Sequence, residues 1–436
     1  TEEHFHFSVF YVALIFLAGY AGLMWLYINR RTSRNVLVLL ALGLVSIEAT
    51  VNTTVTSVTT TSRTSYIKDN QEVRDLIRDL IPNENFFRVE KMDRKTKNDG
   101  AWMNFPSVSL FSSTANADLS AFFKKIGCES STNAYSITGS TPLVDALLGV
   151  KYRLYSEKPL YEEHMTYVAE SGQTFLYENT YALPLGFMVD SSLEDYWQLD
   201  MANPADVQND LCTALGASPV LVEAYGEVYG NQFEFSPEES GEYYAFVMNR
   251  KIKEVTVNCQ EESKTFENVD RGYLLELGRL NKDQNLSMTC DSGQILDVRI
   301  YRFDETGLAE VCDILNRMPW KLTGWSDDKL TGEVTAGYEG ILFTSIPYDK
   351  GWEIQVDGQT VSGEKLVDTF LGVRLTEGHH TISMTYRPQG LKEGIVITFC
   401  SAVLVAFAAM IGALKKRNQR YSEPENQYIT EERQPL

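Results

Sequence analysis

The sequence predicts a membrane-anchored α+β protein with apolar helices that cross a bilayer, one extracytoplasmic α/β unit, and two small antiparallel β-sandwich units. Three observations predict this fold class. Apolar stretches of membrane-crossing length lie near both ends of the 436-residue chain. Strands and helices alternate over residues 66–217. Two blocks of short alternating strands with the same internal order follow, which is typical of sandwiches.

Three segments are predicted to be transmembrane helices, namely Phe7–Ile28, Val36–Val51 and Ile395–Leu414. Each is apolar and long enough to cross, or nearly cross, a hydrocarbon core of roughly 30 Å. Basic residues cluster at 29–35, between the first two helices, and at 415–420, after the third. Because lysine and arginine concentrate on the cytoplasmic side, we expect the first helix to run inward, the second outward and the third inward.

This orientation predicts an extracytoplasmic region over residues 52–393 and a cytoplasmic tail over residues 415–436. The chain opens Thr1-Glu2-Glu3-His4, without methionine and without the basic start of a signal peptide. We therefore expect the chain to be the C-terminal part of a longer multi-pass protein. The alternative is a complete chain whose N-terminus is exported.

The chain is acidic, with 39 Lys and Arg against 59 Asp and Glu and a formal net charge of −20. Such a balance argues against nucleic acid as a partner, because phosphates require a basic surface. The acidic surplus fits either a well-solvated exterior or a specific cationic partner.

Neither a metal site nor a cofactor is expected. The pair His4 and His6 lies on a terminal stub, the pair His379-His380 lies in a predicted turn, and neither has a third ligand in view. Glycine-rich loops that cradle phosphates are also missing from the sequence. The cysteines show no CxxC spacing, so they do not indicate a disulfide scaffold; if one bridge exists, Cys259–Cys290 is the expected pair.

The second apolar helix carries one acidic residue, Glu48, near its outer end. Asn52 follows four residues later and therefore shares its helical face. A carboxylate at that depth is costly unless it faces protein or a wet cavity. Glu48 either reaches the headgroup region or forms the outer edge of a membrane-embedded site. A Ser/Thr-rich connector over residues 52–65 leads into the outer region.

The α/β unit over residues 66–217 is predicted from periodicity and from glycine and proline positions. In order, the expected elements are a helix over Gln71–Leu80, a strand at Phe86–Val89, helices over Leu119–Ile126 and Pro142–Leu148, strands at Val150–Tyr155, Phe175–Glu178 and Gly186–Val189, and a helix over Ala205–Leu215. Gly149 ends the second of the middle helices. Lys151, just beyond it, is either structural or a phosphate contact.

An internal repeat predicts the two β-sandwich units, residues 218–302 and 331–390. Each copy consists of a strand, a strand ending in Asn or Asp, a further strand, a turn, and a strand that contains Ser-Met-Thr. The linker between the two copies, residues 303–330, is predicted to contain a helix over Thr306–Arg317.

Trp352 is the aromatic residue with the clearest functional alternative. The stretch from Trp352 to Asp357-Gly358 is typical of a hairpin, since Asp-Gly supplies a turn with positive φ and tryptophan packs on the sheet. The alternative is that the indole stacks on a sugar ring. Tyr243, Tyr244 and Trp197 are likewise either core residues or part of a glycan-binding face.

Residues 104–114 form a polar, serine-rich segment. Its hydroxyl groups, with Phe105 and Phe111 among them, are suited to hydrogen-bonding a sugar or polymer. The sequence has no GxSxG elbow and no plausible Ser/His/Asp set, so hydrolysis is not indicated.

Several motifs in order resemble the YfhO family of bacterial membrane proteins. The resembling segments are Glu48 with Asn52, Leu148–Tyr152, Leu183–Phe187, Pro347–Gly358, Gly378–Ile382 and Tyr386-Arg387-Pro388 before the last apolar helix. The resemblance implies a membrane glycosyltransferase of the GT-C-like type at the bacterial cell membrane. Such an enzyme takes a polyprenyl-phosphate-linked sugar as donor and a cell-wall polymer such as teichoic acid as acceptor, with membrane lipid around it.

In that architecture the catalytic acidic residue lies in the first outer loop, near the N-terminus of the whole protein. We expect that loop to be outside this chain, so no catalytic residue is assigned. The substrate-binding candidates are Glu48, Asn52 and Trp352, with Glu2 and Glu3 near the outer membrane boundary. The alternative function is a non-catalytic, membrane-anchored module that binds glycan or scaffolds envelope proteins.

Overall fold

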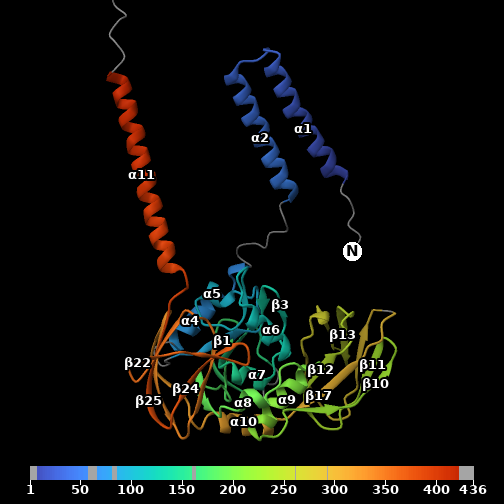
Figure 1. Ribbon diagram of the computed structural model, residues 1–436. Coiled ribbons are helices and arrows are strands. Elements are labelled where there is room, and N and C mark those ends of the chain that lie inside the picture. The colour runs from blue at the N-terminus through green and yellow to red at the C-terminus, as the bar shows by residue number, and fades with distance from the viewer. Residues whose placement is uncertain are drawn as a thin grey trace, which may run out of the picture. The chain divides into compact units, whose positions relative to one another are not determined.

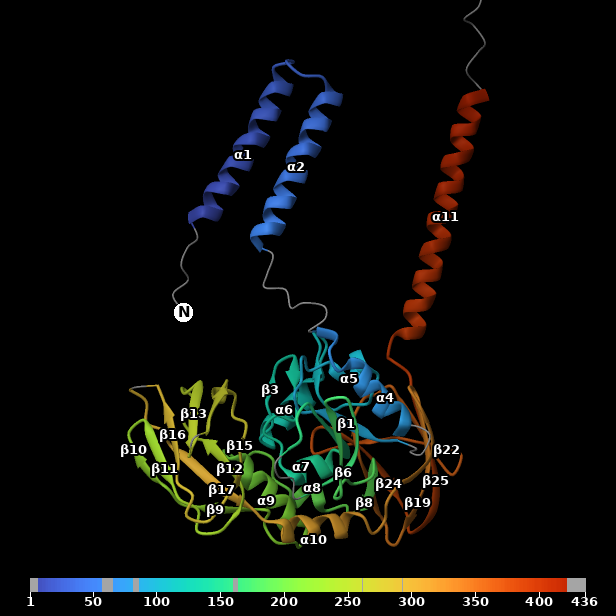
Figure 2. The same ribbon diagram turned by 180° about the vertical axis from the view of Figure 1, so that it is seen from behind.

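The computed structural model of the protein describes residues 7–56, 66–80, 86–159, 164–260, 262–291 and 293–421. The chain divides into two compact units, residues 1–68 and 69–436. Figures 1 and 2 show the elements of each unit from opposite sides. Mixed helices and small antiparallel sheets, with three apolar helices of membrane-spanning length, confirm the predicted fold class. Glu2, Glu3, His4, His6 and most of the predicted connector lie outside the described residues.

The first unit is a helical hairpin of α1 (Phe7–Ile28) and α2 (Arg34–Thr56). The predicted first helix is confirmed, and the second is longer than predicted at both ends, starting at Arg34 and continuing to Thr56. The hydroxyl of Ser33 accepts a hydrogen bond from the Val36 amide at 3.4 Å, and Arg30 turns the chain at φ 50°. The α2 span that is apolar enough to cross a membrane runs over 34–53.

The second unit begins with an α/β part built on the sheet β1-β5-β7-β6, in which β1 runs parallel to β5 and the other pairs are antiparallel. Its strands are β1 (Arg88–Lys91), β5 (Val150–Tyr155), β6 (Met165–Ser171) and β7 (Thr174–Asn179). A small sheet contains β2 (Leu110–Phe111), β3 (Ser130–Ser131) and β4 (Ala134–Tyr135). The helices are α4 (Asn70–Leu80), α5 (Asp99–Met103), α6 (Ala117–Lys125), α7 (Pro142–Leu147), α8 (Leu193–Tyr196) and α9 (Pro204–Leu215).

Local sequence explains the turn from α7 into β5. Thr141 caps α7 by accepting a hydrogen bond from the Val144 amide at 3.4 Å, and Pro142 occupies the first helical turn. Gly149 then adopts φ 64°, a conformation that costs glycine little, and the chain enters β5. The predicted strand at Phe86–Val89 is shifted along the chain, since β1 starts at Arg88.

The first β-sandwich packs the sheet β10-β11-β16-β13-β14 on the sheet β15-β12-β17-β9 (Figure 2). Its elements are β9 (Leu221–Ala224), β10 (Glu227–Tyr229), β11 (Gln232–Phe235), β12 (Gly241–Val247), β13 (Glu254–Cys259), β14 (Glu262–Glu267), the 3₁₀ turn η2 (Val269–Arg271), β15 (Leu275–Leu280), β16 (Leu286–Cys290) and β17 (Val298–Phe303). Cys259 and Cys290 are free thiols at opposite ends of the β13–β16 pair, so the expected bridge is wrong. Cys259 pairs with Leu286 and Cys290 with Val255.

The second β-sandwich packs the sheet β18-β19-β25-β21-β22 on the sheet β23-β24-β20-β8. Its elements are β8 (Gly186–Val189), β18 (Lys321–Ser326), β19 (Lys329–Ala336), β20 (Gly340–Pro347), β21 (Trp352–Val356), β22 (Gln359–Val361), β23 (Glu364–Leu366), β24 (Phe370–Leu375) and β25 (Gly378–Tyr386). The helix α10 (Glu305–Leu315) links the sandwiches, and α11 (Leu391–Tyr421) follows the second.

The internal repeat is visible in the strand pairing. In the first copy β12 pairs with β15 and β13 with β16; in the second β20 pairs with β24 and β21 with β25. Met288 and Met384, from the two Ser-Met-Thr segments, are both fully buried. One position differs, because β17 flanks β12 whereas β8, which precedes both sandwiches in sequence, flanks β20. Strand β8, which falls within the predicted α/β unit, therefore belongs to the second sandwich. The predicted boundaries of the units stay predictions.

The hairpin predicted from Asp357-Gly358 is present between β21 and β22, with φ 53° and 79° at these two residues. The prediction that His379 and His380 lie in a turn is wrong, because both belong to β25. His380 is 9% exposed; its Nδ1 lies 2.8 Å from Asp357 Oδ2 and its Nε2 lies 3.0 Å from the Thr376 carbonyl oxygen. Both neighbours are acceptors, so only the charged imidazolium donates to both.

The His380–Asp357 pair predicts a pH-dependent stability. Burial lowers the pKa of His380, but the bonds to Asp357 and Thr376 outweigh it and raise the pKa above its ordinary value. The hydrogen bond from His380 lowers the pKa of Asp357. Stabilisation by His380 should thus be complete below about pH 6.5 and be lost as pH rises through the raised pKa. That of Asp357 should be complete above about pH 3.9 and be lost as pH falls through its lowered pKa.

The thermal unfolding midpoint of His380→Gln, compared with the unchanged protein, checks this expectation. The difference should be larger near pH ~5.5 than near pH ~9. His379→Gln is the matched control, because His379 is exposed. A difference of the same size at both pH values would contradict the assignment.

Candidate functional site

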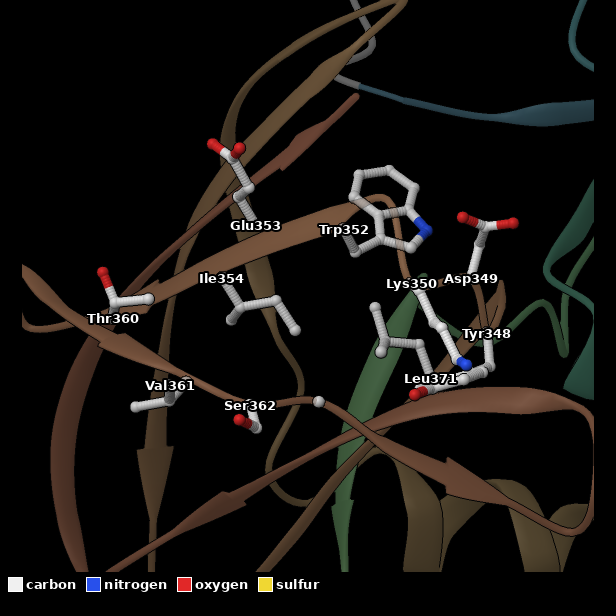
Figure 3. A pocket seen from close by; sticks show the side chains of 11 residues that line it. Tyr348, Asp349, Lys350, Trp352, Glu353, Ile354, Thr360, Val361, Ser362 and Leu371 are labelled. Atoms are coloured by element: carbon white, nitrogen blue, oxygen red, sulfur yellow. The ribbon is translucent and has the colours of Figure 1, made fainter. Parts of the chain in front are cut away.

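Trp352 lines a pocket of about 290 Å³ in the second β-sandwich (Figure 3). The walls come from the turn that follows β20, from β21, from β22 and the segment that joins it to β23, and from β24. The lining residues are Tyr348, Asp349, Lys350, Trp352, Glu353, Ile354, Thr360, Val361, Ser362, Gly363 and Leu371. An indole, apolar side chains and several groups that accept or donate hydrogen bonds thus surround one hollow, which suits a small polar ligand with an apolar face.

The indole of Trp352 is half-buried and held by Tyr386. The two residues are paired between β21 and β25, and their rings lie 5.1 Å apart at an angle of 55°. Figure 3 shows the indole beside the Asp349 carboxylate, with Ile354 and Leu371 lower in the pocket. The hairpin prediction is confirmed for the backbone, and the side chain still presents part of its surface to the pocket.

Polar groups are placed on both sides of the pocket. Asp349 Oδ1 accepts the Gly351 amide at 2.6 Å, which fixes the carboxylate next to the indole. Burial, followed by the nearby Asp349, raises the pKa of Tyr386, so its hydroxyl remains protonated at neutral pH. Figure 3 shows Thr360 and Ser362 across the pocket from Asp349.

The pocket is tied to the start of α11. The Arg387 amide donates to the Gly351 carbonyl at 2.8 Å, next to Trp352, and α11 begins at Leu391. The five residue-to-residue steps from Tyr386 to Leu391 span at most about 18 Å when fully extended. Since α11 has a 25-residue apolar span over Leu391–Lys415, the covalent chain keeps the Trp352 pocket close to a membrane-spanning helix.

Glu48 has a defined partner inside the helical hairpin. The Tyr20 hydroxyl of α1 donates to Glu48 Oε2 at 2.5 Å. At 1.5 Å per residue, Tyr20 lies about 12 Å of helix from Ile28, and Glu48 lies about 21 Å from Arg34. Both side chains lean toward the start of their own helix, so they meet between these depths, within the apolar span. The Tyr20 contact gives the Glu48 carboxylate a protein partner within this apolar span, where a carboxylate without one is costly.

The three candidate residues belong to two different compact units. Asn52 lies in α2 with Glu48, where it has a partner of its own, and Trp352 belongs to the other compact unit.

Other aromatic and hydroxyl candidates are structural. Tyr243, Tyr244 and Trp197 are 2–3% exposed, so they are core residues and cannot face a glycan. The serine-rich segment turns inward, since Ser107 and Ser109 donate to the buried carboxylate of Glu90.

Three helices long and apolar enough to cross a membrane, together with two β-sandwiches, define the class of a membrane protein with a large folded part between its apolar helices. The family described as "Bacterial membrane protein YfhO" matches residues 2–232 and 223–398 of the chain. The chain therefore belongs to the YfhO family of bacterial membrane proteins.

A relative from Bacillus subtilis (strain 168), described as "Uncharacterized protein YfhO", is 23% identical over 80% of this chain. The match covers 46% of that relative, so the chain spans about half its length.

Two solved structures show limited likeness. The mycobacterial arabinofuranosyltransferase AftD, solved by cryo-electron microscopy, is 9% identical and matches 54% of this chain and 26% of its own, with a TM-score of 0.15. A cupin 2 conserved barrel domain protein from Leptotrichia buccalis is 11% identical and matches 38% of this chain and 90% of its own, with a TM-score of 0.11. Such low scores do not establish a common fold.

Proposed function

We propose that this chain is the C-terminal part of a membrane glycosyltransferase that moves sugar from a polyprenyl-phosphate carrier to an extracytoplasmic cell-envelope polymer such as teichoic acid. Membership of a bacterial membrane protein family and three apolar helices support the membrane location. The resemblance of its motifs to those of YfhO-like proteins supports the chemistry. The basic clusters support an outer region over residues 52–393 and a cytoplasmic C-terminus.

The observation that carries the proposal is the tether between the Trp352 pocket and α11. A sugar attached to a membrane lipid reaches the protein at the membrane surface, and the short link from Tyr386 to Leu391 holds an aromatic pocket there. The flat indole would stack on the sugar ring, and Asp349 would accept hydrogen bonds from its hydroxyls. Glu48 and Asn52, in the helical hairpin, are separate candidates for contacts with the lipid donor.

The alternative is a non-catalytic surface module that binds glycan or scaffolds envelope proteins. The same pocket supports it, because a stacking tryptophan binds a sugar whether or not a transfer follows. The two functions differ in the polymer that the cell makes: only the enzyme changes its sugar content.

The test is complementation of a bacterial strain that lacks the gene encoding this chain. We expect wall polymer from that strain to lack the sugar substituent, as measured by NMR of the extracted polymer, and the unchanged gene to restore it. Trp352→Ala should lower the restored substitution by up to about tenfold, because an aromatic contact contributes about 0.5–1.5 kcal/mol.

Trp352→Phe, which keeps an aromatic face, should retain most of the activity. Tyr196→Ala is the control, since Tyr196 is 64% exposed and lies outside the pocket. Unchanged polymer in the deletion strain would refute the enzyme and leave the surface module.

A further inference from the structure

A second pocket, of about 300 Å³, opens where the α/β part meets the second sandwich. It is lined by Phe86, Arg88, Gly149, Lys151, the segment 182–185 and Asn316. Two of these residues are cationic, and none of the lining residues, all within the described chain, is acidic. In a protein with a net charge of −20, a hollow whose only charged side chains are cations needs an explanation.

The guanidinium of Arg88 is anchored in a way that leaves one edge open. Its Nη1 donates to Ser345 Oγ at 2.7 Å and its Nη2 to the Ser345 carbonyl at 2.9 Å, while Nη1 also donates to the Leu148 carbonyl. Three of the five N–H groups are therefore used. The remaining two, on Nε and Nη2, lie on the same edge of the planar group. That edge is the fork that binds two oxygens of a phosphate or carboxylate.

The charge of Arg88 is not neutralised by these contacts. All three acceptors are neutral, and no carboxylate of the described residues lies within 4.0 Å of the guanidinium. Desolvation lowers the pKa of Arg88 to about 10, opposed by the charge of Glu90. Glu90 itself is occupied by serine and backbone donors. A half-buried cation without an ion-pair partner is costly unless an anion joins it.

Lys151 and Gly149 line the pocket next to Arg88. Lys151 is 27% exposed and keeps Glu178 at 3.7 Å, a distance at which its ammonium can also serve the pocket. A Cβ on Gly149 would lie 3.7 Å from Arg88 Nη1 and 3.2 Å from the Leu183 carbonyl oxygen. Glycine therefore leaves the space beside the guanidinium of Arg88 unfilled. The turn from α7 into β5 thus provides Gly149, which leaves space beside Arg88, and it is followed by Lys151, the second cation of the pocket.

We propose that this pocket is a phosphate-binding site, in which the open edge of Arg88 takes two non-bridging oxygens of a phosphate mono- or diester. Lys151 contacts the third oxygen of a monoester, or shares one of the two oxygens of a diester. A phosphate monoester has three non-bridging oxygens, so two can occupy the fork of Arg88 while the third accepts from Lys151; a diester has two, and one of them can accept from both cations. The phosphate comes either from a glycerol-phosphate type polymer or from a polyprenyl phosphate. The site does not depend on sugar transfer by the same protein.

The test measures binding by the full chain in detergent or nanodiscs, without any transfer reaction. A soluble glycerol phosphate oligomer is one probe, and a polyprenyl phosphate in nanodiscs is the other; calorimetry or ³¹P NMR follows each. We expect Lys151→Gln to weaken binding by about fivefold to tenfold and Arg88→Lys by more, because the bidentate fork is lost. The probe that responds identifies the source of the phosphate.

Two further variants protect the test against misfolding. Ala182→Glu places a carboxylate at the wall without touching the Arg88 anchors, and it should abolish binding while the unfolding midpoint stays unchanged. Lys251→Gln removes one exposed charge in the first sandwich and should leave affinity unchanged. Failure of both probes to bind, or equal affinity in the unchanged protein, Lys151→Gln and Ala182→Glu, would overturn the proposal. Binding without any sugar transfer in cells would instead refute the proposed enzyme and retain this site.

Discussion

Replacing Asp145 by alanine should lower the free energy of unfolding by about 3–5 kcal/mol, because it removes the carboxylate that pairs with the buried guanidinium of Arg153. Asp145 is fully buried, and Arg153 is 6% exposed. Arg153 Nε donates to Asp145 Oδ2 at 2.9 Å, and its Nη2 donates to the same oxygen. The pair links α7 to β5 across the turn at Gly149. It should therefore stabilise the position of this turn, which lines the proposed phosphate pocket, as well as the fold.

Chemical denaturation of the full chain in detergent measures this effect. The double variant Asp145→Ala with Arg153→Met should recover much of the loss, because it removes the stranded charge and fills the space. Arg78→Met is the surface control, since Arg78 pairs with Asp75 at 70% exposure and such pairs contribute little. If Asp145→Ala and Arg78→Met lower the free energy of unfolding equally, the buried pair contributes no more to stability than a surface pair, which would contradict the prediction.

Local patterns predict most of the elements. The first apolar helix, β5 and β8 have their predicted bounds, and α7 and α9 differ by one residue at an end. These segments have strong periodicity or clear punctuation, such as Pro142 at a helix start and Gly149 after a helix end. The repeat is also recognisable in the sequence, because both copies keep the same order of strands and a Ser-Met-Thr segment in the last one.

Long-range pairing does not follow from one sequence. Nothing local in Gly186–Val189 indicates that it lies beside Ile341–Thr344, since any short apolar strand fits many neighbours. The turn prediction for His380 is wrong because Gly378-His379 has the composition of a turn, while the strand forms by pairing with the distant β19, where Val334 lies opposite His380.

The candidate sites divide in the same way. Trp352 is a candidate from sequence because an aromatic residue close to Asp-Gly is visible in one short segment. The proposed phosphate pocket depends on Arg88, Lys151 and Ser345, which are far apart in sequence. The sequence alone therefore suggests a phosphate contact for Lys151 but does not indicate that Arg88 lies beside it. The one available signal is that Leu148–Tyr152 and Leu183–Phe187 both carry motifs; only the structure shows that they form adjacent walls.

The second large effect is expected for Glu90→Ala, which should lower the free energy of unfolding by about 3–5 kcal/mol. Glu90 is 1% exposed. Its Oε1 accepts hydrogen bonds from the Ser107 hydroxyl at 2.6 Å and the amides of Val108 and Ser109 at 2.7 and 3.0 Å, and its Oε2 accepts the Ser109 hydroxyl at 2.8 Å. Alanine would leave these four donors without their acceptor.

Denaturant unfolding of Glu90→Ala, Glu90→Gln and Ser107→Ala separates the possible causes. Glutamine keeps one acceptor oxygen and should cost less than alanine, and Ser107→Ala removes a single donor and should cost about 1 kcal/mol. A Glu90→Ala loss no larger than that of Ser107→Ala would contradict the proposed network. Glu90 lies two residues from Arg88 on β1, and its negative charge partly offsets that of Arg88. Glu90→Gln removes this charge, so the positive potential at Arg88 should increase. The phosphate probe should therefore bind Glu90→Gln at least as tightly as the unchanged protein, even though the variant is less stable.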